Sequence, residues 1–368
     1  MSRREEATVW INGRFLQRPV TGVERVAREL LQELSRRLDA QGRLDRDGRP
    51  ALRFRLLGPA AMTEGSPWPN LPLVRRGAGN GHVWEQTSLP LLTRGAWLLS
   101  LCNTGPLFKR RQLLFLHDAQ VYAIPANFTW RFRAWYRVLF AIAGRHARIL
   151  ATNSRFSQAE LAHRAGLEPG RFTIVPLGAE HVLRTDPLPA ARAWDGPYLL
   201  AVSSPNPNKN LKAVEDALAL LGPGAPPCVL VGKRCEGVFR APDLAGARLH
   251  HTGYLRDEEL YGLYGQALCL AFPSFYEGFG LPPLEAMALG CPVIVARSGA
   301  LPEVCGEAAL YCDPHDPATL AQAIRAFQAA PALREEYRAR GRARAARFTW
   351  AGGVYALLAA LLRELSGA

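Results

Sequence analysis

Two glutamates, Glu277 and Glu285, flank a short segment with glycine and proline in FPSFYEGFGLPPLEAMALG (272–290). Carboxylates accept hydrogen bonds from hydroxyl groups. Placed on either side of an anion site, the two acids would suit a ligand with a diphosphate in its middle and a sugar at each end. The alternative is an ordinary capped helix in which Glu285 only interacts favourably with the helix dipole. The spacing alone leaves both interpretations open.

The residues between the two glutamates predict the mouth of a helix. Pro282 and Pro283 suit the first helical positions, where a missing N–H costs nothing, and Gly290 suits the helix end. Gly278 and Gly280 allow a ligand to approach the backbone closely. A helix mouth is a site for an anion, best a phosphate. The backbone N–H groups at this mouth are those of Phe279, Gly280 and Leu281.

Three further residues with suitable chemistry lie where a strand leads into a loop or helix. Lys209, in SSPNPNKNLKAVEDAL (203–218), could meet a diphosphate as a point charge, although a lone loop lysine is usually solvated. Gly22 lies at the turn into the first helix, where a simple turn glycine is the alternative. His117 follows the strand QLLFL and could hydrogen-bond a sugar hydroxyl or stabilise charge.

Strand-like and helix-like segments alternate along the whole chain. TVWINGRF (8–15) is typical of a strand, and TGVERVARELLQELSRRL (21–38) is typical of an amphipathic helix. This alternation predicts an α/β fold with parallel sheets. Doubly wound sheets bind ligands beyond the carboxyl ends of their strands, and the candidate residues follow predicted strands.

The chain has 368 residues, more than one core usually organises, which predicts two domains. We expect two Rossmann-like doubly wound domains that face each other across a cleft. A segment rich in proline, alanine and charge is the expected linker. The boundaries are an N-terminal domain over 1–182, a linker over 183–197, a C-terminal domain over 198–346 and a last helix over 347–368 that packs back toward the N-terminal domain.

The composition, 48% hydrophobic and 21% charged, is that of an ordinary globular protein. The sequence contains no run of about 18 uncharged apolar residues and no apolar signal-peptide core, so we expect a cytoplasmic protein without a transmembrane helix. Seven dispersed cysteines without a C-x-x-C pair predict reduced thiols. The D-x-D at 45–47 lies in a polar loop, and we expect no metal site.

The net charge of +13, largely from arginine, predicts an anionic partner: nucleic acid, a phosphate-bearing substrate or an anionic membrane face. A general enrichment in arginine is the alternative. No nucleic-acid-binding module is recognisable, so we expect no nucleic-acid partner.

Several ordered motifs resemble the retaining glycosyltransferases of family 4, the glycosyl transferases group 1, which have the two-domain GT-B architecture. The strongest is FYEGFGLPPLEAMALGCPVIVARSGALPEV (275–304), which matches the family's E-x7-E stretch and the strand and loop after it. NKNLKAVEDAL (208–218), TNSRFSQAEL (152–161) and TGVERVAREL (21–30) fit their usual places. The resemblance covers most of the chain.

The resemblance implies a role for each matching residue. Glu277 would hold hydroxyls of the transferred sugar, and Glu285 would hold the ribose of the nucleotide. Lys209 and the backbone amides of 279–281 would hold the diphosphate, which the turn at Gly22 would approach from the N-terminal domain. The E-x7-E stretch also brings Gly278 into the donor-binding set.

The same resemblance places His117 near the transferred sugar, and Tyr254 and Leu255 near the base. The catalytic candidates are therefore Glu277, Lys209 and His117. Family members often carry an arginine six positions before the lysine, but this chain has Ser203 there. The phosphate contact is then expected to depend more on the lysine and the backbone amides.

The function implied is a retaining, metal-independent hexosyltransferase that moves a hexose from a nucleotide-sugar to a glycan or lipid-linked saccharide in cell-surface polysaccharide synthesis. The N-terminal domain would bind the acceptor and the C-terminal domain the nucleotide-sugar, which is a substrate, so no cofactor is implied. GDP-mannose is the first candidate donor, and UDP- and dTDP-sugars stay open. The alternatives are a nucleotide-sugar epimerase, a phosphorylase-like enzyme on the same fold, and a non-catalytic basic protein that binds a membrane or nucleic acid.

Basic segments of the N-terminal domain suggest a place for a lipid-linked acceptor. FKRRQ (108–112) and the arginine-rich helix at 131–148 could meet a lipid-phosphate carrier at the inner membrane face. Solvated surface is the alternative. We therefore expect a cytoplasmic protein with peripheral contact to an anionic membrane.

Overall fold

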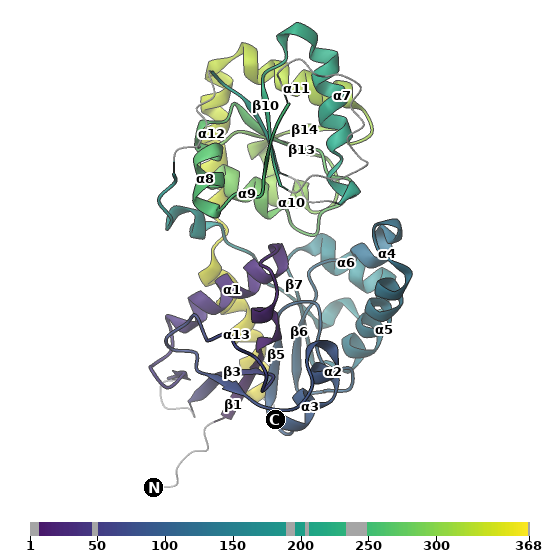
Figure 1. The fold of residues 1–368 in the computed structure, drawn as a ribbon, viewed down its shortest axis with the longest axis vertical. Helices are drawn as coiled ribbons and strands as arrows, with labels where there is room; N and C mark the ends of the chain where they lie inside the picture. The colour runs from purple at the N-terminus through teal and green to yellow at the C-terminus, as the bar shows by residue number, and fades with distance from the viewer. Residues whose placement is uncertain (1–6, 46–50, 189–195, 203–205, 233–248, 367–368) are drawn as a thin grey trace. The chain divides into compact units, whose positions relative to one another are not determined.

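The chain folds into two compact units. The computed structural model describes residues 7–45, 51–188, 196–202, 206–232 and 249–366 (Figure 1). The N-terminal unit comprises Met1–Leu177 and Trp350–Ala368, and the C-terminal unit comprises Gly178–Thr349. Residues 178–182, expected in the first domain, thus belong to the second unit, whereas the last helix belongs to the first.

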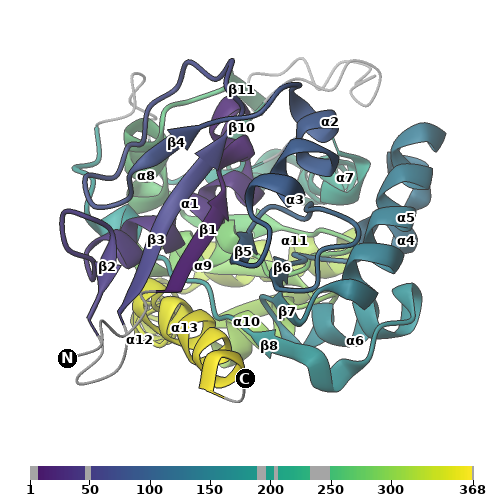
Figure 2. The same cartoon turned by 90° about the horizontal axis from the view of Figure 1, so that it is seen from below.

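The N-terminal unit contains an eight-stranded sheet in which only the pairing of β2 is antiparallel among the described strands. Figure 2 shows the strands side by side, in the order β2 (Arg43–Leu44), β3 (Leu52–Gly58), β1 (Ala7–Asn12), β5 (Trp97–Ser100), β6 (Gln112–Phe115), β7 (Ile149–Thr152) and β8 (Phe172–Ile174), with β4 (Leu73–Arg75) paired to β3. The direction of winding reverses between β1 and β5, which makes this the switch point of a doubly wound sheet.

The N-terminal unit also contains seven helices among its described residues, of which the last, α13, follows the C-terminal unit in the chain. They are α1 (Gly22–Ser35), α2 (Gly81–Gln86), α3 (Ser88–Leu92), α4 (Gln120–Ala123), α5 (Trp130–His146), α6 (Arg155–Ala165) and α13 (Trp350–Ser366), with short 3-10 turns η1 (Gly13–Gln17), η2 (Pro125–Asn127) and η3 (Pro169–Arg171). The expected strand over 8–15 therefore stops at Asn12, because the chain turns into η1 there. Residues 59–95, in which the sequence shows no clear periodicity, contain the short elements β4, α2 and α3.

One helical stretch, Pro331–Ser366, is long and apolar enough to cross a membrane by length and composition. It joins α12 (Pro331–Ala345) to α13, and the apolar side of α13 packs on α1 within the N-terminal unit. The side chains that meet there are Leu30, Leu31, Leu34, Val354, Leu357 and Leu361. Gly353 allows this close approach, since a Cβ at this position would lie 3.0 Å from Cδ2 of Leu30 in α1 and 2.6 Å from the carbonyl oxygen of Pro176.

The C-terminal unit contains a six-stranded parallel sheet. Its strands run in the order β11 (Leu249–Gly253), β10 (Cys228–Val231), β9 (Leu199–Val202), β12 (Cys269–Phe272), β13 (Val293–Ala296) and β14 (Ala309–Cys312). This is the order 3-2-1-4-5-6 of the dinucleotide-binding Rossmann fold, with its switch point between β9 and β12. Apart from the edge strand β11 (LHHTG), the strands are short, largely apolar runs, because both faces of a parallel sheet are covered.

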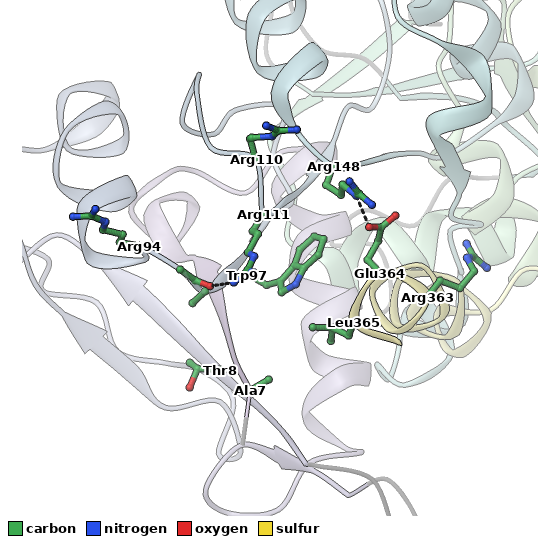
Figure 3. A pocket seen from close by; sticks show the side chains of 12 residues that line it. Ala7, Thr8, Arg94, Trp97, Arg110, Arg111, Arg148, Arg363, Glu364 and Leu365 are labelled. Carbon is green, nitrogen blue, oxygen red and sulfur yellow. Dashed lines mark hydrogen bonds and ion pairs between the residues drawn. The ribbon is translucent and has the colours of Figure 1, made fainter. Parts of the chain in front are cut away.

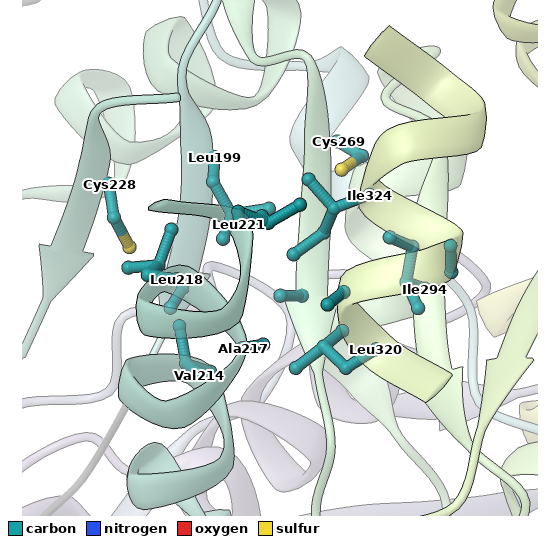
Figure 4. Close-up of a cluster of buried hydrophobic side chains, with 14 of the residues drawn as sticks. Leu199, Val214, Ala217, Leu218, Leu221, Cys228, Cys269, Ile294, Leu320 and Ile324 are labelled. Atoms are coloured by element: carbon teal, nitrogen blue, oxygen red, sulfur yellow. The ribbon is translucent and has the colours of Figure 1, made fainter. Parts of the chain in front are cut away.

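Two groups of helices enclose this sheet (Figure 1). α7 (Leu211–Leu221) packs on α11 (Pro317–Ala329), and α9 (Leu281–Ala288) packs on α12, with α8 (Asp257–Gln266) and α10 (Leu301–Cys305) beside α9. The short turns are η4 (Glu180–Leu183), η5 (Pro207–Lys209), η6 (Gly222–Gly224) and η7 (Gly306–Ala308). Figure 4 shows the core under α7 and α11, which includes Leu199, Leu218, Ile294, Leu320 and Ile324.

The cysteines contribute to these cores as buried free thiols. The six in the described part of the chain are Cys102, Cys228, Cys269, Cys291, Cys305 and Cys312. Burial raises the pKa of the Cys228 thiol to about 12, so this thiol stays protonated and unreactive at neutral pH. The D-x-D at 45–47 lies outside the described residues except for Asp45.

Candidate functional site

Two loops leave the sheet of the C-terminal unit at its switch point. One follows β9 and includes η5 with Lys209, and the other follows β12 and carries Glu277. β9 and β12 are hydrogen-bonded parallel neighbours, so their loops emerge beside each other at the carboxyl edge of the sheet. This edge is where doubly wound sheets bind ligands. The strand order therefore brings together two residues that are 68 positions apart.

Lys209 and Glu277 form an ion pair at this edge. The lysine Nζ lies 2.7 Å from Oε1 of Glu277 and 4.7 Å from the ring centroid of Phe272. Only 19% of the lysine side chain and 9% of the glutamate side chain are exposed, which shields the pair from water. The ammonium has three donors and the carboxylate two acceptors. The pair can therefore contact a phosphate oxygen through the lysine and sugar hydroxyls through the glutamate at the same time.

Two asparagines of the loop after β9 hold the loop that carries Glu277. Nδ2 of Asn208 donates to the carbonyl of Tyr276. Asn210, whose φ of 53° is left-handed, donates from Nδ2 to the carbonyl of Pro273 at 3.1 Å. Sequence reasoning did not single these residues out. The visible signal was the asparagine-rich run NPNKN (206–210), since asparagine tolerates the left-handed region and pairs readily with backbone groups.

The loop after β13 supports Glu277 from another side. The N–H of Ala300 donates to the Glu277 carbonyl at 2.9 Å. The preceding residue, Gly299, has a φ of 58°, and a Cβ there would lie 2.5 Å from the same carbonyl oxygen and 2.7 Å from the Glu277 nitrogen. Glycine at this position thus lets two backbone segments touch.

The helix mouth expected after Gly280 is present. α9 begins at Leu281, Gly280 caps it with a φ of 102°, and Pro282 and Pro283 lie in its first turn. Neither proline brings an N–H group. In the described part of the chain, the N–H groups of Phe279, Gly280 and Leu281 have no hydrogen-bond acceptor. They are therefore available to an anion.

Glu285 is the fifth residue of α9, just beyond the first turn of the helix. Its Oε1 lies 2.9 Å from Nε2 of His181, and both side chains are buried. One carboxylate oxygen is thus positioned by the histidine, and the other is left for a hydroxyl. Sequence reasoning missed His181 because it falls in η4, 104 residues away, where no motif marks it.

We expect His181→Phe to weaken the binding of the nucleoside diphosphate about tenfold. The change keeps the ring volume but removes the hydrogen bond that orients Glu285, a loss of about 1.5 kcal/mol. Titration calorimetry with the nucleotide measures the effect. His181→Gln, which retains a donor, should recover part of the affinity, and equal affinities for wild type and His181→Phe would contradict the role given to this histidine.

Gly22 and His117 follow carboxyl ends of strands in the N-terminal unit. Gly22 is the exposed first residue of α1, and a Cβ there would meet nothing within 4 Å. No packing contact requires glycine at this position, which leaves the backbone open to a ligand. His117 is buried after β6, where its ring stacks on Phe115 at 4.4 Å and its Nε2 lies 2.9 Å from the Leu101 carbonyl.

Burial lowers the pKa of His117 to about 4, although the Leu101 carbonyl and the charge of Glu24 oppose this shift. The imidazole is therefore neutral at pH 7. Its Nε2–H donates to Leu101, and Nδ1 is left as an acceptor. Of the two roles considered for His117, a hydrogen bond with a sugar hydroxyl fits this state better than stabilisation of negative charge by an imidazolium.

The same shift predicts a pH dependence of stability. Below about pH 6.5 the unfolded chain protonates His117, whereas the folded chain resists protonation until about pH 4. This contribution to the free energy of unfolding is complete above pH 6.5 and falls by about 3 kcal/mol as the pH drops to 4. Urea unfolding at pH 7 and 4.5 measures it. His117→Gln should lose less stability than wild type over this interval, and an equal loss in both proteins would contradict the assignment.

A buried polar network lies at the same edge of the N-terminal unit. Oε1 of Glu85 accepts hydrogen bonds from Asn12 (2.7 Å), Thr104 (2.9 Å) and Arg14 (3.2 Å), and Oε2 lies 3.1 Å from Nδ1 of His82. Burial raises the pKa of Glu85, but the His82 hydrogen bond and the Arg14 charge outweigh it and hold the pKa below its usual range. No motif marked this network. Its carboxylate is satisfied by the protein itself, and it holds His82 in place at the surface.

The remaining predicted donor residues are Tyr254, Leu255 and Gly278. Tyr254 follows β11, two strands away from β9, and 73% of it is exposed. Leu255 comes next and is partly buried. Their contact with a base stays a prediction. Gly278 lies next to Glu277 in the loop after β12. Ser203 lies outside the described residues, so the effect of the missing arginine also stays a prediction.

Residues 189–344, nearly all of the C-terminal unit, match the family model for glycosyl transferases group 1. The C-terminal unit is thus a domain of the glycosyl transferases group 1. The resemblance drawn from the ordered motifs is thereby confirmed. The matched region includes the Lys209–Glu277 pair, the helix mouth and Glu285.

Curated relatives agree with this assignment. The chain is 34% identical over 220 residues to the O-antigen chain mannosyltransferase B of Escherichia coli, an alignment that covers 55% of this chain and 58% of the relative. It is 30% identical over 275 residues to the D-inositol 3-phosphate glycosyltransferase of Corynebacterium efficiens, covering 67% and 61%. The chain thus spans less than two thirds of the length of these relatives.

The fold is confirmed by comparison with solved structures. The sucrose-phosphate synthase of Thermosynechococcus elongatus matches with a TM-score of 0.73 at 19% identity, covering 99% of this chain and 100% of the other. This likeness and the two Rossmann-like units identify the fold as GT-B. At this identity the comparison concerns the fold alone.

Proposed function

We propose that this protein transfers a hexose from a nucleotide-sugar to a glycan or lipid-linked saccharide, with retention of configuration and without a metal. The observation that carries the proposal is the meeting of an ammonium, a carboxylate and open backbone amides at the switch point of a Rossmann-like sheet. The ammonium of Lys209 and the amides before α9 suit a diphosphate. The carboxylate of Glu277 suits the hydroxyls of a sugar. Membership of the C-terminal unit in the glycosyl transferases group 1 supports the same reaction.

The ion pair favours attack from the face of the leaving group. A covalent route to retention needs a carboxylate on the opposite face of the sugar. Glu277 contacts the same ammonium that would hold the diphosphate, which favours a position on the leaving-group side. In the proposed step, the bond between C1 and the phosphate oxygen breaks and its electron pair leaves with the nucleoside diphosphate. The acceptor oxygen bonds to C1 on the same face, and its proton passes to the departing phosphate.

This site can lower the reaction barrier mainly by stabilising the negative charge that develops on the departing diphosphate. Fixed donors in a water-poor site stabilise such charge without having to reorganise. Lys209 supplies a positive charge, and the amides of Phe279, Gly280 and Leu281 supply dipoles. Glu277 keeps the lysine in place before the donor binds and holds sugar hydroxyls afterwards. These groups suffice for a scheme without a metal ion or cofactor.

The names of the relatives support mannose as the sugar, with GDP-mannose as the first candidate donor and UDP- and dTDP-sugars as alternatives. The O-antigen relatives support a role in cell-surface polysaccharide synthesis. A lipid-linked acceptor would place the protein in the cytoplasm at the inner face of the membrane. Neither nucleic acid nor a further cofactor is part of this proposal.

A panel of GDP, UDP, dTDP and ADP in thermal-shift assays tests the proposed donor class, followed by the corresponding nucleotide-sugars in a transfer assay. We expect one nucleoside diphosphate to raise the melting temperature and its mannose conjugate to be consumed only when a saccharide acceptor is present. Release of free sugar or conversion of the nucleotide-sugar without acceptor would favour the phosphorylase-like or epimerase alternatives. Stabilisation by none of the four nucleotides would overturn the proposal.

A further inference from the structure

A strongly basic hollow lies on the N-terminal unit at the edge opposite to the carboxyl ends of its strands. The main cavity has a volume of about 940 Å³ and lies at the amino ends of β1, β5, β6 and β7 (Figure 3). Two adjoining hollows share lining residues with it. We call the whole surface the arginine basin. Its cationic lining residues are Arg94, Lys109, Arg110, Arg111, Arg145, Arg148, Arg171 and Arg363.

The charge of the arginine basin is largely uncompensated. Glu364 is the one carboxylate among the described lining residues of the three hollows, and it pairs with Arg148. Several other cations donate to backbone carbonyls: Lys109 to Thr93 at 2.8 Å and Arg111 to Gly95 at 2.5 Å. These hydrogen bonds position the side chains without cancelling their charge. Burial, followed by repulsion from the Arg111 charge, lowers the pKa of Lys109 to about 8.

One large apolar side chain stands at the rim of this basin, and a second belongs to a neighbouring helix. Phe108 lines both adjoining hollows, is 71% exposed and packs edge-to-face on His146. Leu91 is 75% exposed and belongs to α3, whose Pro90 lines one of the adjoining hollows. Exposed apolar tips next to clustered cations are typical of surfaces that lie in the headgroup region of an anionic bilayer. The phosphates of a nucleic acid would attract the cations but would offer nothing to an aliphatic side chain such as Leu91.

We propose that the arginine basin is a docking surface for an anionic phospholipid bilayer, with phosphate headgroups in the hollow and Phe108 and Leu91 at the headgroup boundary. The structure thereby revises the grouping made from the sequence. Residues 108–111 of FKRRQ line this surface, whereas Gln112 is buried. Only the C-terminal end of the helix at 131–148 contributes to it.

The position of the basin separates membrane contact from the predicted reaction. Arg111 precedes β6 and His117 follows it, six residues apart along an extended strand, so the two edges are about 20 Å from each other. The acceptor hydroxyl would then belong to sugars at a distance from the lipid phosphate. This orientation rests on the proposed function, but the docking itself does not, because it can be measured without any transfer reaction.

Sedimentation of the full-length protein with vesicles tests the docking. The probes are vesicles of phosphatidylcholine alone and vesicles with about one third phosphatidylglycerol. We expect binding to the anionic vesicles only, with loss of binding at about 1 M salt, where the screening length shrinks to about 3 Å. The double variant Arg110→Glu/Arg111→Glu should bind at least about 30-fold more weakly, since each basic residue near an anionic surface contributes about a fivefold factor. Phe108→Ala should weaken binding without changing its salt dependence.

The matched control is Arg131→Glu/Arg137→Glu, which makes the same charge change on the part of α5 that does not line the basin. This control should bind anionic vesicles within about threefold of wild type. Melting temperatures of all variants establish that they are folded. Equal losses of vesicle affinity in both double variants would show that only the net charge of the protein matters, and this would overturn the proposal. Binding to a DNA duplex with no binding to anionic vesicles would also overturn it and assign the basin to a nucleic acid.

Discussion

Replacing Glu277 with glutamine is expected to lower kcat/KM for glycosyl transfer by about 10²- to 10³-fold, the range seen when a group that stabilises the transition state is lost. Glutamine preserves the size of the side chain but removes the charge that holds Lys209 at 2.7 Å. It also replaces one carboxylate oxygen, which can accept a hydrogen bond from a sugar hydroxyl, by an NH2 group, which can only donate. Initial rates with the donor identified in the nucleotide panel measure the loss.

A double-mutant cycle shows whether the two residues act as one unit. Lys209→Met alone leaves Glu277 buried without its cation, so its melting temperature should fall as well as its rate. If the pair works together, the double variant should be far less impaired than the product of the two single effects. Glu336→Gln, an exposed site on α12, is the control and should keep the wild-type rate. A Glu277→Gln variant with more than a tenth of the wild-type rate would exclude the role proposed here.

Gly299→Ala is the second change with a large expected effect: we expect it to lower the rate of glycosyl transfer about 10²-fold. A displacement of about 1 Å at a reacting centre lowers a rate by about this factor. The added Cβ would lie 2.5 Å from the carbonyl oxygen and 2.7 Å from the nitrogen of Glu277. Both are backbone atoms and cannot rotate away. The φ of 58° adds strain of about 1–2 kcal/mol for any residue other than glycine. The loop that carries Glu277 must therefore move.

Gly265→Ala is the matched control for this prediction. Gly265 lies within α8, and a Cβ there would meet nothing within 4 Å, so alanine should raise stability slightly. Transfer rates and melting temperatures are measured for both variants, the rates well below the melting transition. A Gly299→Ala protein that is folded and as active as wild type would show that this contact does not fix the site.

Several features of the site were predictable from the sequence because they are encoded locally. The proline pair and Gly280 define the mouth of α9 within a few residues, and the alternation of strand and helix patterns predicts doubly wound α/β domains. The order of several motifs also carried the resemblance to the glycosyl transferases group 1, which the family match confirms. These signals can be recognised in the sequence alone because caps, turns and periodicity depend on residues that are close together in the chain.

The loop after β12 was correctly placed next to a helix mouth, but its supports were not foreseen. Asn208, Asn210 and Gly299 act on it from other loops. Each is an ordinary loop residue by composition, so its type alone did not distinguish a support from a solvated turn. Short elements such as α2 were missed for a related reason, since six residues are too few to show a period.

The sequence by itself determined the kinds of element, the helix mouth and the family, whereas the tertiary structure decided which residues share a site. The contact of Lys209 with Glu277 and that of Glu285 with His181 join positions 68 and 104 residues apart. The arginine basin likewise gathers cations from the starts of several strands and the end of α13. The physical reason is that strand order sets which loops are neighbours. That order results from long-range packing of the sheet, which no local pattern of residues specifies.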